Sequence, residues 1–465
     1  MDVPRRRGRR RLARLAAAAV VLAFLAPAAY AAVTPGSADL GPGTVAEPAD
    51  ERTYVSIQGF HFAGYGQSKK PARLVAADGA AEPVWRFDGG RDSRWFYEVD
   101  PLPGGTLFVT STNPDGTVAF EYDPATDEIV RRYDRPGLID THNTAWLGDG
   151  RLLVANMRAT ENGVSDDRLF VRNVTTGETE WEWYFRNHYS EDTDGGVNDD
   201  WTHVNDAETI GDGDRYVLAS PRNFDQVIVV DRRTDEIVMR LGEDGNHSVL
   251  NEQHNPDYLE RDDGTPVLLV ADSENDRVVE YERDCGDADP RLGAGTPPAD
   301  CGWKLVWAVD GFNWPRDADR LPNGNTLVTD TLNHRVVEVT PEGEVVWEFH
   351  ATWAPYDAER GAPGSDGPTM ADRSAGGRVT VSGGADDSPA SRYRVADAIA
   401  AAGAEELAST YGHVEPWIRP AWMGSWAFLA AIFGVLVALT WGVAEAVGRR
   451  DRLAAALDRG RGRDD

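Results

Sequence analysis

The sequence predicts an all-β protein, a six-bladed β-propeller carried between two apolar segments. Between residues 51 and 350 a unit of roughly 45 to 60 residues recurs, and each copy holds short apolar runs separated by Gly, Asn and Asp turns. The runs alternate with a period of two and show no helical period, which favours strands. Radial copies of a small sheet bury both of its faces and leave no long exposed edge, so the recurrence indicates a propeller rather than a sandwich.

Each repeat contributes three recognisable strands. The first follows a turn such as GDG or PNGN and reads TLFVTS, RLLVAN, RYVLAS, VLLVAD and TLVTD in five copies. A second apolar strand and a third strand, which often carries Trp, complete the copy. A sixth, degenerate copy lies between Thr53 and Asp88, which gives six blades. We expect the first strand of each blade to line the central channel.

The N-terminal residues 1–33 have the pattern of a signal peptide or a signal anchor. A basic run from Arg5 to Arg14 precedes an apolar run that ends at Val33, and Ala29-Tyr30-Ala31 offers a small-residue cleavage site. Residues 34–50 are expected to form a linker to the propeller at residues 51–350.

Beyond the repeats, residues 351–416 are rich in Ala, Gly, Asp and Ser and predict a flexible spacer with a possible short helix. A transmembrane helix is expected over 417–447, because the stretch from Trp422 to Ala444 carries no charge and can cross about 30 Å of hydrocarbon. Residues 448–465 form a basic tail. The positive-inside rule predicts that the propeller lies outside the cell membrane. Both termini are expected in the cytoplasm if the N-terminal segment is not cleaved, and membrane lipid is the expected partner of the terminal helices.

The charge of the chain is strongly acidic. It carries 77 acidic and 47 basic residues, a net charge of −30, and its only lysines are Lys69, Lys70 and Lys304. Nucleic acid is therefore not expected as a partner. Such a surface is typical of proteins from salt-loving organisms, where a Debye length of ~3 Å at about 1 M salt screens the carboxylates from one another. The alternative is an ordinary acidic, solvated surface.

Cys285 and Cys301 flank a Gly/Pro/Asp-rich insertion, GDADPRLGAGTPPAD. In an oxidising compartment they most simply form one disulfide that closes this loop. A free pair and a metal or redox role are the alternatives.

Three histidines occupy the same place in successive repeats. His142, His203 and His254 each precede a turn and then an apolar strand, and alignment on the strand ends puts Tyr97 and Arg316 in corresponding positions. If the repeats are radial, these side chains converge on one axis. Two arginines at a matching offset behind the strands, Arg158 and Arg222, are expected to join them. A cluster of His and Arg suits an anionic ligand.

Three histidines alone could form a zinc site. The arginines argue against it, because a fixed cation weakens the binding of a divalent metal, whereas a guanidinium fork matches a tetrahedral oxyanion. The arrangement suits transfer of a sulfuryl or phosphoryl group, in which one neutral imidazole attacks and the others protonate the leaving oxygen or hold the oxyanion. We expect no metal and no cofactor.

The segment from Asp200 to His254, with the motifs Asp-x-x-His-x-Asn, Ser-x-Arg, Leu-Gly and Gln-His in that order, resembles the PAPS-independent arylsulfotransferases. The resemblance extends over about Tyr97 to Phe349, and the flanking membrane segments and acidic surface suggest a membrane-anchored, haloarchaeal-like member. It implies a propeller enzyme that moves a sulfuryl group from an aryl sulfate donor to a phenolic acceptor by a ping-pong route.

The resemblance also implies roles for single residues. His254 would become sulfated, His203 and Arg222 would grip the sulfuryl oxygens, and His142 would assist them. The expected substrate-binding residues are Arg158, Asn205, Arg316 and Tyr97.

Two other functions remain open. A propeller can bind a ligand or a partner at the cell surface without catalysis, and NWPRDADRLPNGNTLVTDTLNHRVVEV resembles the NHL repeats of binding propellers. A lyase or hydrolase with a metal in the channel is the third interpretation.

Overall fold

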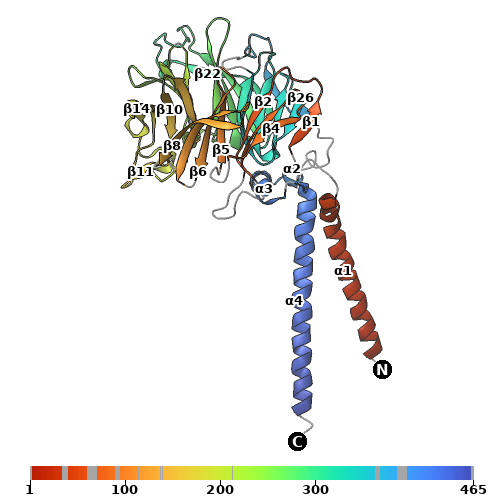
Figure 1. Cartoon of the computed structure of the whole chain (residues 1–465). Coiled ribbons are helices and arrows are strands. Elements are labelled where there is room, and N and C mark those ends of the chain that lie inside the picture. Colours follow the sequence, from red (N-terminus) through yellow and green to blue (C-terminus); the bar gives the residue numbers. More distant parts are fainter. Residues whose placement is uncertain are drawn as a thin grey trace. The chain divides into compact units, whose positions relative to one another are not determined.

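The computed structural model describes residues 3–33, 40–59, 71–89, 95–113, 115–136, 138, 140–211, 213–361, 367–384, 395–420 and 422–461. The chain divides into two compact units, Asp39–Ala385 and a unit formed by the two chain ends. The first unit is a six-bladed β-propeller built from six antiparallel sheets (Figure 1).

Each blade has four strands, which run in order from the innermost to the outermost. The first blade is β27 (Pro355–Arg360), β2 (Thr53–Ile57), β3 (Arg73–Ala77) and β4 (Pro83–Phe87); the second is β5 (Trp95–Pro101), β6 (Leu107–Asn113), β7 (Gly116–Asp123) and β8 (Glu128–Pro136). The third is β9 (Thr144–Gly148), β10 (Arg151–Asn156), β13 (Arg168–Asn173) and β14 (Thr179–Tyr184), and it carries the small hairpin β11 (Thr160–Glu161) and β12 (Val164–Ser165).

The other three blades continue in chain order. The fourth is β15 (Val204–Ile210), β16 (Tyr216–Pro221), β17 (Gln226–Asp231) and β18 (Glu236–Gly242), and the fifth is β19 (His254–Glu260), β20 (Pro266–Asp272), β21 (Arg277–Asp284) and β22 (Gly302–Asp310). The sixth is β23 (Pro315–Arg320), β24 (Thr326–Asp330), β25 (Arg335–Val339) and β26 (Glu344–His350). Added edge strands are β28 (Gly377–Thr380) on β22, and β1 (Gly41–Val45) and β29 (Ser382–Gly383) on β26.

The predicted position of one strand in each blade was wrong. Runs such as TLFVTS and RLLVAN form the second strands, β6 and β10, and the channel is lined by the strand before them. These innermost strands, for example VNDAETI in β15, carry Asp, Asn and Glu on the side that faces the central cavity. Because those polar residues break the apolar alternation, the strands lack the usual sequence signal.

The ring closes through a strand that lies outside the predicted propeller boundary of residues 51–350. β27 pairs with β2 from Thr53 opposite Arg360 to Ile57 opposite Pro355. The predicted spacer at 351–416 therefore contributes the innermost strand of the first blade, as well as β28 and β29. Its partner strand is some 300 residues away in the sequence, so no local pattern marks the pairing.

The core lies between neighbouring blades. Between the third and fourth blades, Leu153 and Leu169 pack with Ala207 and Val217, all fully buried. Cys285 and Cys301 form a disulfide that closes the loop between β21 and β22.

The second unit contains the helices α1 (Val3–Val33), α2 (Val395–Ala401), α3 (Glu405–Ile418) and α4 (Ser425–Arg461). The segments Arg11–Val33 and Ser425–Arg450 are long and apolar enough to cross a membrane. The expected start of the second span at residue 417 is corrected, because Trp417 belongs to α3, which ends at Ile418, and α4 begins only at Ser425. The predicted tail at 448–465 continues α4 as far as Arg461.

Candidate active site

The innermost strands bring one polar or aromatic side chain from each blade to one place. We call this set the inner ring, and its members lie within two residues of the first residue of their strands: Tyr97, His142, His203, His254, Arg316 and Tyr356. The ring centroids of His142 and His203 are 5.1 Å apart, and Tyr97 stacks on His142 at 4.0 Å. Tyr356 lies near both His142 and His254 in the inner ring, because the centroid of its aromatic ring is 5.4 Å from that of His142 and 6.1 Å from that of His254.

Five of these six residues were predicted from the sequence, and Tyr356 was missed. Its signal was present, because APYDAER at Tyr356 repeats WPRDADR at Arg316. This repeat falls after residue 350, in the expected spacer. The Tyr356 hydroxyl lies 3.0 Å from His142 Nδ1 and is therefore part of the site.

The hydrogen bonds of His254 fix its tautomer. The Ser273 hydroxyl donates to the Pro315 carbonyl at 2.6 Å, so its oxygen accepts from His254 Nδ1–H at 2.8 Å. Nε2 then carries the lone pair. Burial, followed by the nearby charges of Arg316 and Arg222, holds the pKa of His254 well below its usual range, so the imidazole is neutral at pH 7.

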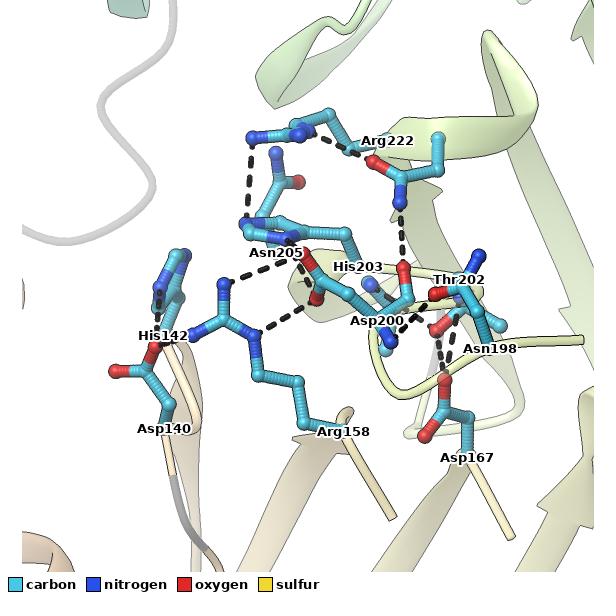
Figure 2. A network of polar contacts seen from close by, with 12 residues as sticks. Asp140, His142, Arg158, Asp167, Asn198, Asp200, Thr202, His203, Asn205 and Arg222 are labelled. Carbon is cyan, nitrogen blue, oxygen red and sulfur yellow. Dashed lines mark hydrogen bonds and ion pairs between the residues drawn. The ribbon is translucent and has the colours of Figure 1, made fainter. Parts of the chain in front are cut away.

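A hydrogen-bonded network positions His203 (Figure 2). His203 Nδ1 lies 2.9 Å from both carboxylate oxygens of Asp200, and Arg158 Nε donates to Asp200 at 2.8 Å. Burial raises the pKa of Asp200, but the hydrogen bonds from His203 and Arg158 outweigh it and lower that pKa below its usual range. His203 has a φ of 40°, in the left-handed region that residues other than glycine adopt less often.

The predicted substrate contact of Arg158 is not supported by its surroundings. Its guanidinium forms ion pairs with both Asp140 and Asp200 (Figure 2). Tyr97 donates a further hydrogen bond to Asp140 at 2.6 Å. Two carboxylates therefore already neutralise Arg158, and through Asp200 it is linked to His203.

Arg222 lies beside the imidazole of His203, as the sequence predicts. Its Nη1 lies 3.4 Å from His203 Nε2, to which it donates, while its Nη2 pairs with Glu252 at 2.9 Å. Arg222 follows β16 directly and begins the turn Arg222–Phe224.

Arg316 differs from the other two arginines. It is 5% exposed, donates to the Gln58 side chain at 2.6 Å, and lies over the rings of Trp314 and Tyr356 at 4.4 and 4.8 Å. Among the described residues no carboxylate is in ion-pair contact with it, Asp140 acts on it only from a longer distance, and its Nε has no hydrogen-bond partner. Burial lowers the pKa of Arg316 to about 10, which still leaves it charged at pH 7. A buried, uncompensated guanidinium is costly, and an anion is its natural partner.

Asn205 acts on the neighbouring blade. Its amide donates to the Gln253 carbonyl at 2.9 Å, and the Gln253 side chain donates to Ser220 and to the Gln226 carbonyl at 3.0 and 2.6 Å. Both Asn205 and Gln253 are fully buried. Asn205 is thereby hydrogen bonded to the residue directly before His254, across two neighbouring blades.

The fold and the site together define a class: a six-bladed propeller whose innermost strands assemble neutral histidines around a buried, uncompensated arginine. Residues 58–286 match the family model of the arylsulfotransferases (ASST). The match covers just under half of the chain, includes His142, His203 and His254, and supports the assignment of this part to that family. No curated protein matches the chain.

Several solved structures are similar to this chain at low identity. A protein of unknown function from Bacteroides caccae has 13% identity and a TM-score of 0.44, covering 68% of this chain and 99% of its own. A putative 6-phosphogluconolactonase from Bacteroides fragilis has 13% identity and a TM-score of 0.41, covering 68% and 100%. A catalytically inactive virginiamycin B lyase from Staphylococcus aureus has 9% identity and a TM-score of 0.39, covering 68% and 86%. These likenesses are too distant to indicate a function.

Proposed function

We propose that this protein is a membrane-anchored, extracytoplasmic aryl sulfotransferase that works by a ping-pong route through a sulfohistidine at His254. The observation that carries the proposal is the pairing of a neutral imidazole, whose Nε2 lone pair is fixed by Ser273, with the uncompensated charge of Arg316. A nucleophile and an anion site are thus contributed by adjacent blades.

In the first step His254 Nε2 attacks the sulfur of an aryl sulfate. The N–S bond forms while the S–O bond to the aryl group breaks, and the aryl oxygen leaves with the electron pair. Arg316 and Arg222 stabilise the negative charge on the sulfuryl oxygens, which is most effective in a buried site. The Tyr356 hydroxyl gives the leaving oxygen its proton, and the positive charge of Arg316 beside its ring stabilises the tyrosinate until the acceptor returns a proton.

In the second step a phenolic acceptor takes the place of the product. It returns its proton to the Tyr356 oxygen, its own oxygen attacks the sulfur, and the N–S bond breaks so that neutral His254 is restored. No cofactor is needed, since every proton moved in one step is moved back in the other.

The location rests on features outside the inner ring. The two apolar helices fit membrane anchoring, and the basic residues from Arg5 to Arg14 and after Arg449 favour the cytoplasm for both termini. A disulfide in the propeller suits an oxidising exterior.

The test uses the full-length chain in detergent at high salt with p-nitrophenyl sulfate and phenol. We expect nitrophenol release, sulfate on His254 by mass spectrometry when the acceptor is omitted, and loss of both in His254→Ala. His247→Ala is the matched control, because His247 has a side chain that is 60% exposed and lies outside the inner ring. Equal release by His254→Ala and wild type would refute the sulfohistidine route. Sulfate binding without any release would instead favour the non-catalytic binding propeller.

A further inference from the structure

The two apolar helices contact each other within the second unit of the chain. Leu25 of α1 lies against Gly434 of α4, where an added Cβ atom would meet Leu25 Cγ at 3.2 Å. Beside this contact, the ring centroids of Phe24 and Phe433 are 6.3 Å apart. Glycine at position 434 therefore lets the two backbones approach closely, as small residues do between membrane helices.

An ion pair joins the same two helices nearer the ends of the chain. Arg14 Nε donates to Glu445 Oε1 at 3.0 Å, and Arg14 Nη2 donates to Glu445 Oε2 at 2.6 Å. Both residues lie within the apolar spans Arg11–Val33 and Ser425–Arg450. Glu445 is the only acidic residue of its span, and the sequence of α1 has none. Two parallel hydrogen bonds fix the geometry of such a pair, and charged side chains in membrane-spanning segments are rare and pair with one another.

The two contacts share one antiparallel register. Arg14 and Leu25 are eleven residues apart on α1, and Gly434 and Glu445 are eleven residues apart on α4. Eleven residues make about three helical turns, so both contacts lie on the same face of each helix.

The exposure of the side chains marks the same two faces. In the spans, the less exposed residues recur at intervals of three and four: Ala17, Val21, Leu25, Ala28 and Ala31 on α1, and, from Gly434 onward, Gly434, Val437, Trp441, Glu445 and Gly448 on α4. Intervals of three and four are typical of two helices that pack side by side along their length. The faces are thus continuous surfaces rather than two isolated contacts.

We propose that α1 is retained as a permanent membrane helix and pairs with α4 of the same chain to form an antiparallel two-helix membrane domain. Cleavage at Ala29-Tyr30-Ala31 would remove Arg14 and leave the Glu445 carboxylate without its partner in hydrocarbon, which is costly. The antiparallel pairing also places both chain ends on one side of the membrane by geometry, independently of the distribution of basic residues.

Retention is tested on the unmodified full-length chain, purified in detergent from the membranes of the expression host. Intact mass spectrometry should give the mass of the whole chain, 50.8 kDa. A mature chain that begins after Ala31 would overturn the proposal. This measurement needs no variant, so it does not depend on how a substitution affects folding.

Pairing is tested by disulfide cross-linking of Leu25→Cys/Gly434→Cys in the membrane. The two natural cysteines are already bonded to each other, and the close approach of positions 25 and 434 suits a new disulfide. We expect a cross-link within one chain under mild oxidation, seen on a non-reducing gel and by peptide mapping. The matched control is Leu25→Cys/Leu436→Cys, which should not cross-link because Leu436 is 51% exposed and lies on another face of α4. Equal cross-linking of both variants, or a cross-link only between two chains, would overturn the pairing.

The ion pair is tested in the same cross-linking assay. Glu445→Arg should slow the formation of the disulfide between positions 25 and 434, and the exchange Arg14→Glu/Glu445→Arg should restore its rate. A rate that the exchange does not restore would refute the role of the ion pair. None of these readouts uses sulfuryl transfer, and α4 alone would still anchor the propeller, so failure here leaves the proposed activity untouched. Loss of nitrophenol release would equally leave the pairing untouched.

Discussion

Arg316 gives the sharpest test of the site, because one substitution should move activity and stability in opposite directions. Burial lowers its pKa from 12.5 to about 10, which corresponds to a desolvation cost on the order of 3 kcal/mol in the folded state. The contacts with the Trp314 and Tyr356 rings offset part of that, at about 1 kcal/mol each. Arg316→Gln should therefore leave the free energy of unfolding unchanged or raise it by about 1 kcal/mol.

The effect of the same substitution on catalysis should be large. Removal of one charged donor to a developing oxyanion costs roughly 3 kcal/mol of transition-state stabilisation, or about 100- to 1,000-fold in kcat. Release of nitrophenol from p-nitrophenyl sulfate measures this loss, and denaturant unfolding followed by tryptophan fluorescence at constant salt measures stability.

Arg158→Gln is the contrasting variant. It leaves the carboxylates of Asp140 and Asp200 partly buried without their cation, so it should destabilise the protein by about 1–3 kcal/mol. If Arg316→Gln were destabilising by a similar amount and left the rate intact, Arg316 would be a structural residue and the anion site would lie elsewhere.

The contacts of the site and the disulfide loop lead to three further predictions. Because burial lowers the folded pKa values of His203 and His254, both imidazoles are neutral above pH 6.5. The acid limb of the pH profile of kcat/KM should therefore lie below pH 6.5, and a limb above that pH would contradict the burial argument. The pKa of Asp200 is lowered, so the stability that its carboxylate contributes is fully present above its unfolded pKa near 3.8 and is lost as the pH falls through the folded pKa. The difference in the free energy of unfolding between wild type and Asp200→Asn should therefore persist at pH 6 and close in acid, as urea unfolding at both pH values would show. The disulfide Cys285–Cys301 spans 16 residues, so Cys285→Ser/Cys301→Ser should cost about 3 kcal/mol, and an unchanged unfolding midpoint would contradict this.

Much of the inner ring could be predicted because its signal is local. His142, His203 and His254 stand at one position of a repeat, and a repeat places equivalent residues around one axis whatever the details of packing. Tyr356 obeys the same rule, and APYDAER repeats the motif around Arg316, but it lies beyond residue 350 because the strand that carries it closes the ring with β2 from the start of the propeller. The motif is local, whereas its pairing with β2 is not marked by any pattern near either strand.

The roles of the arginines could not be predicted from spacing. Arg158 and Arg222 occupy matching offsets, yet Arg158 is neutralised by two carboxylates while Arg222 keeps a contact with His203. The partner Asp200 lies in the loop before β15, far from Arg158 in the sequence. Which cation remains uncompensated is decided by such distant partners, and only the structure identifies Arg316.

The two layers of the channel explain each other electrostatically. A buried arginine and neutral histidines attract an anion at the inner ring, and the next residues along the same strands present carboxyl groups that would repel it. If those groups were ionised without a counter-charge, their field would lower the affinity for sulfate a few ångströms away and raise the pKa of the histidines. Protonation weakens this field. The nucleophile at His254 therefore depends on the charge state of the acidic layer, so Asp206→Asn/Asp357→Asn, which removes two of these carboxyl groups, should preserve sulfate binding.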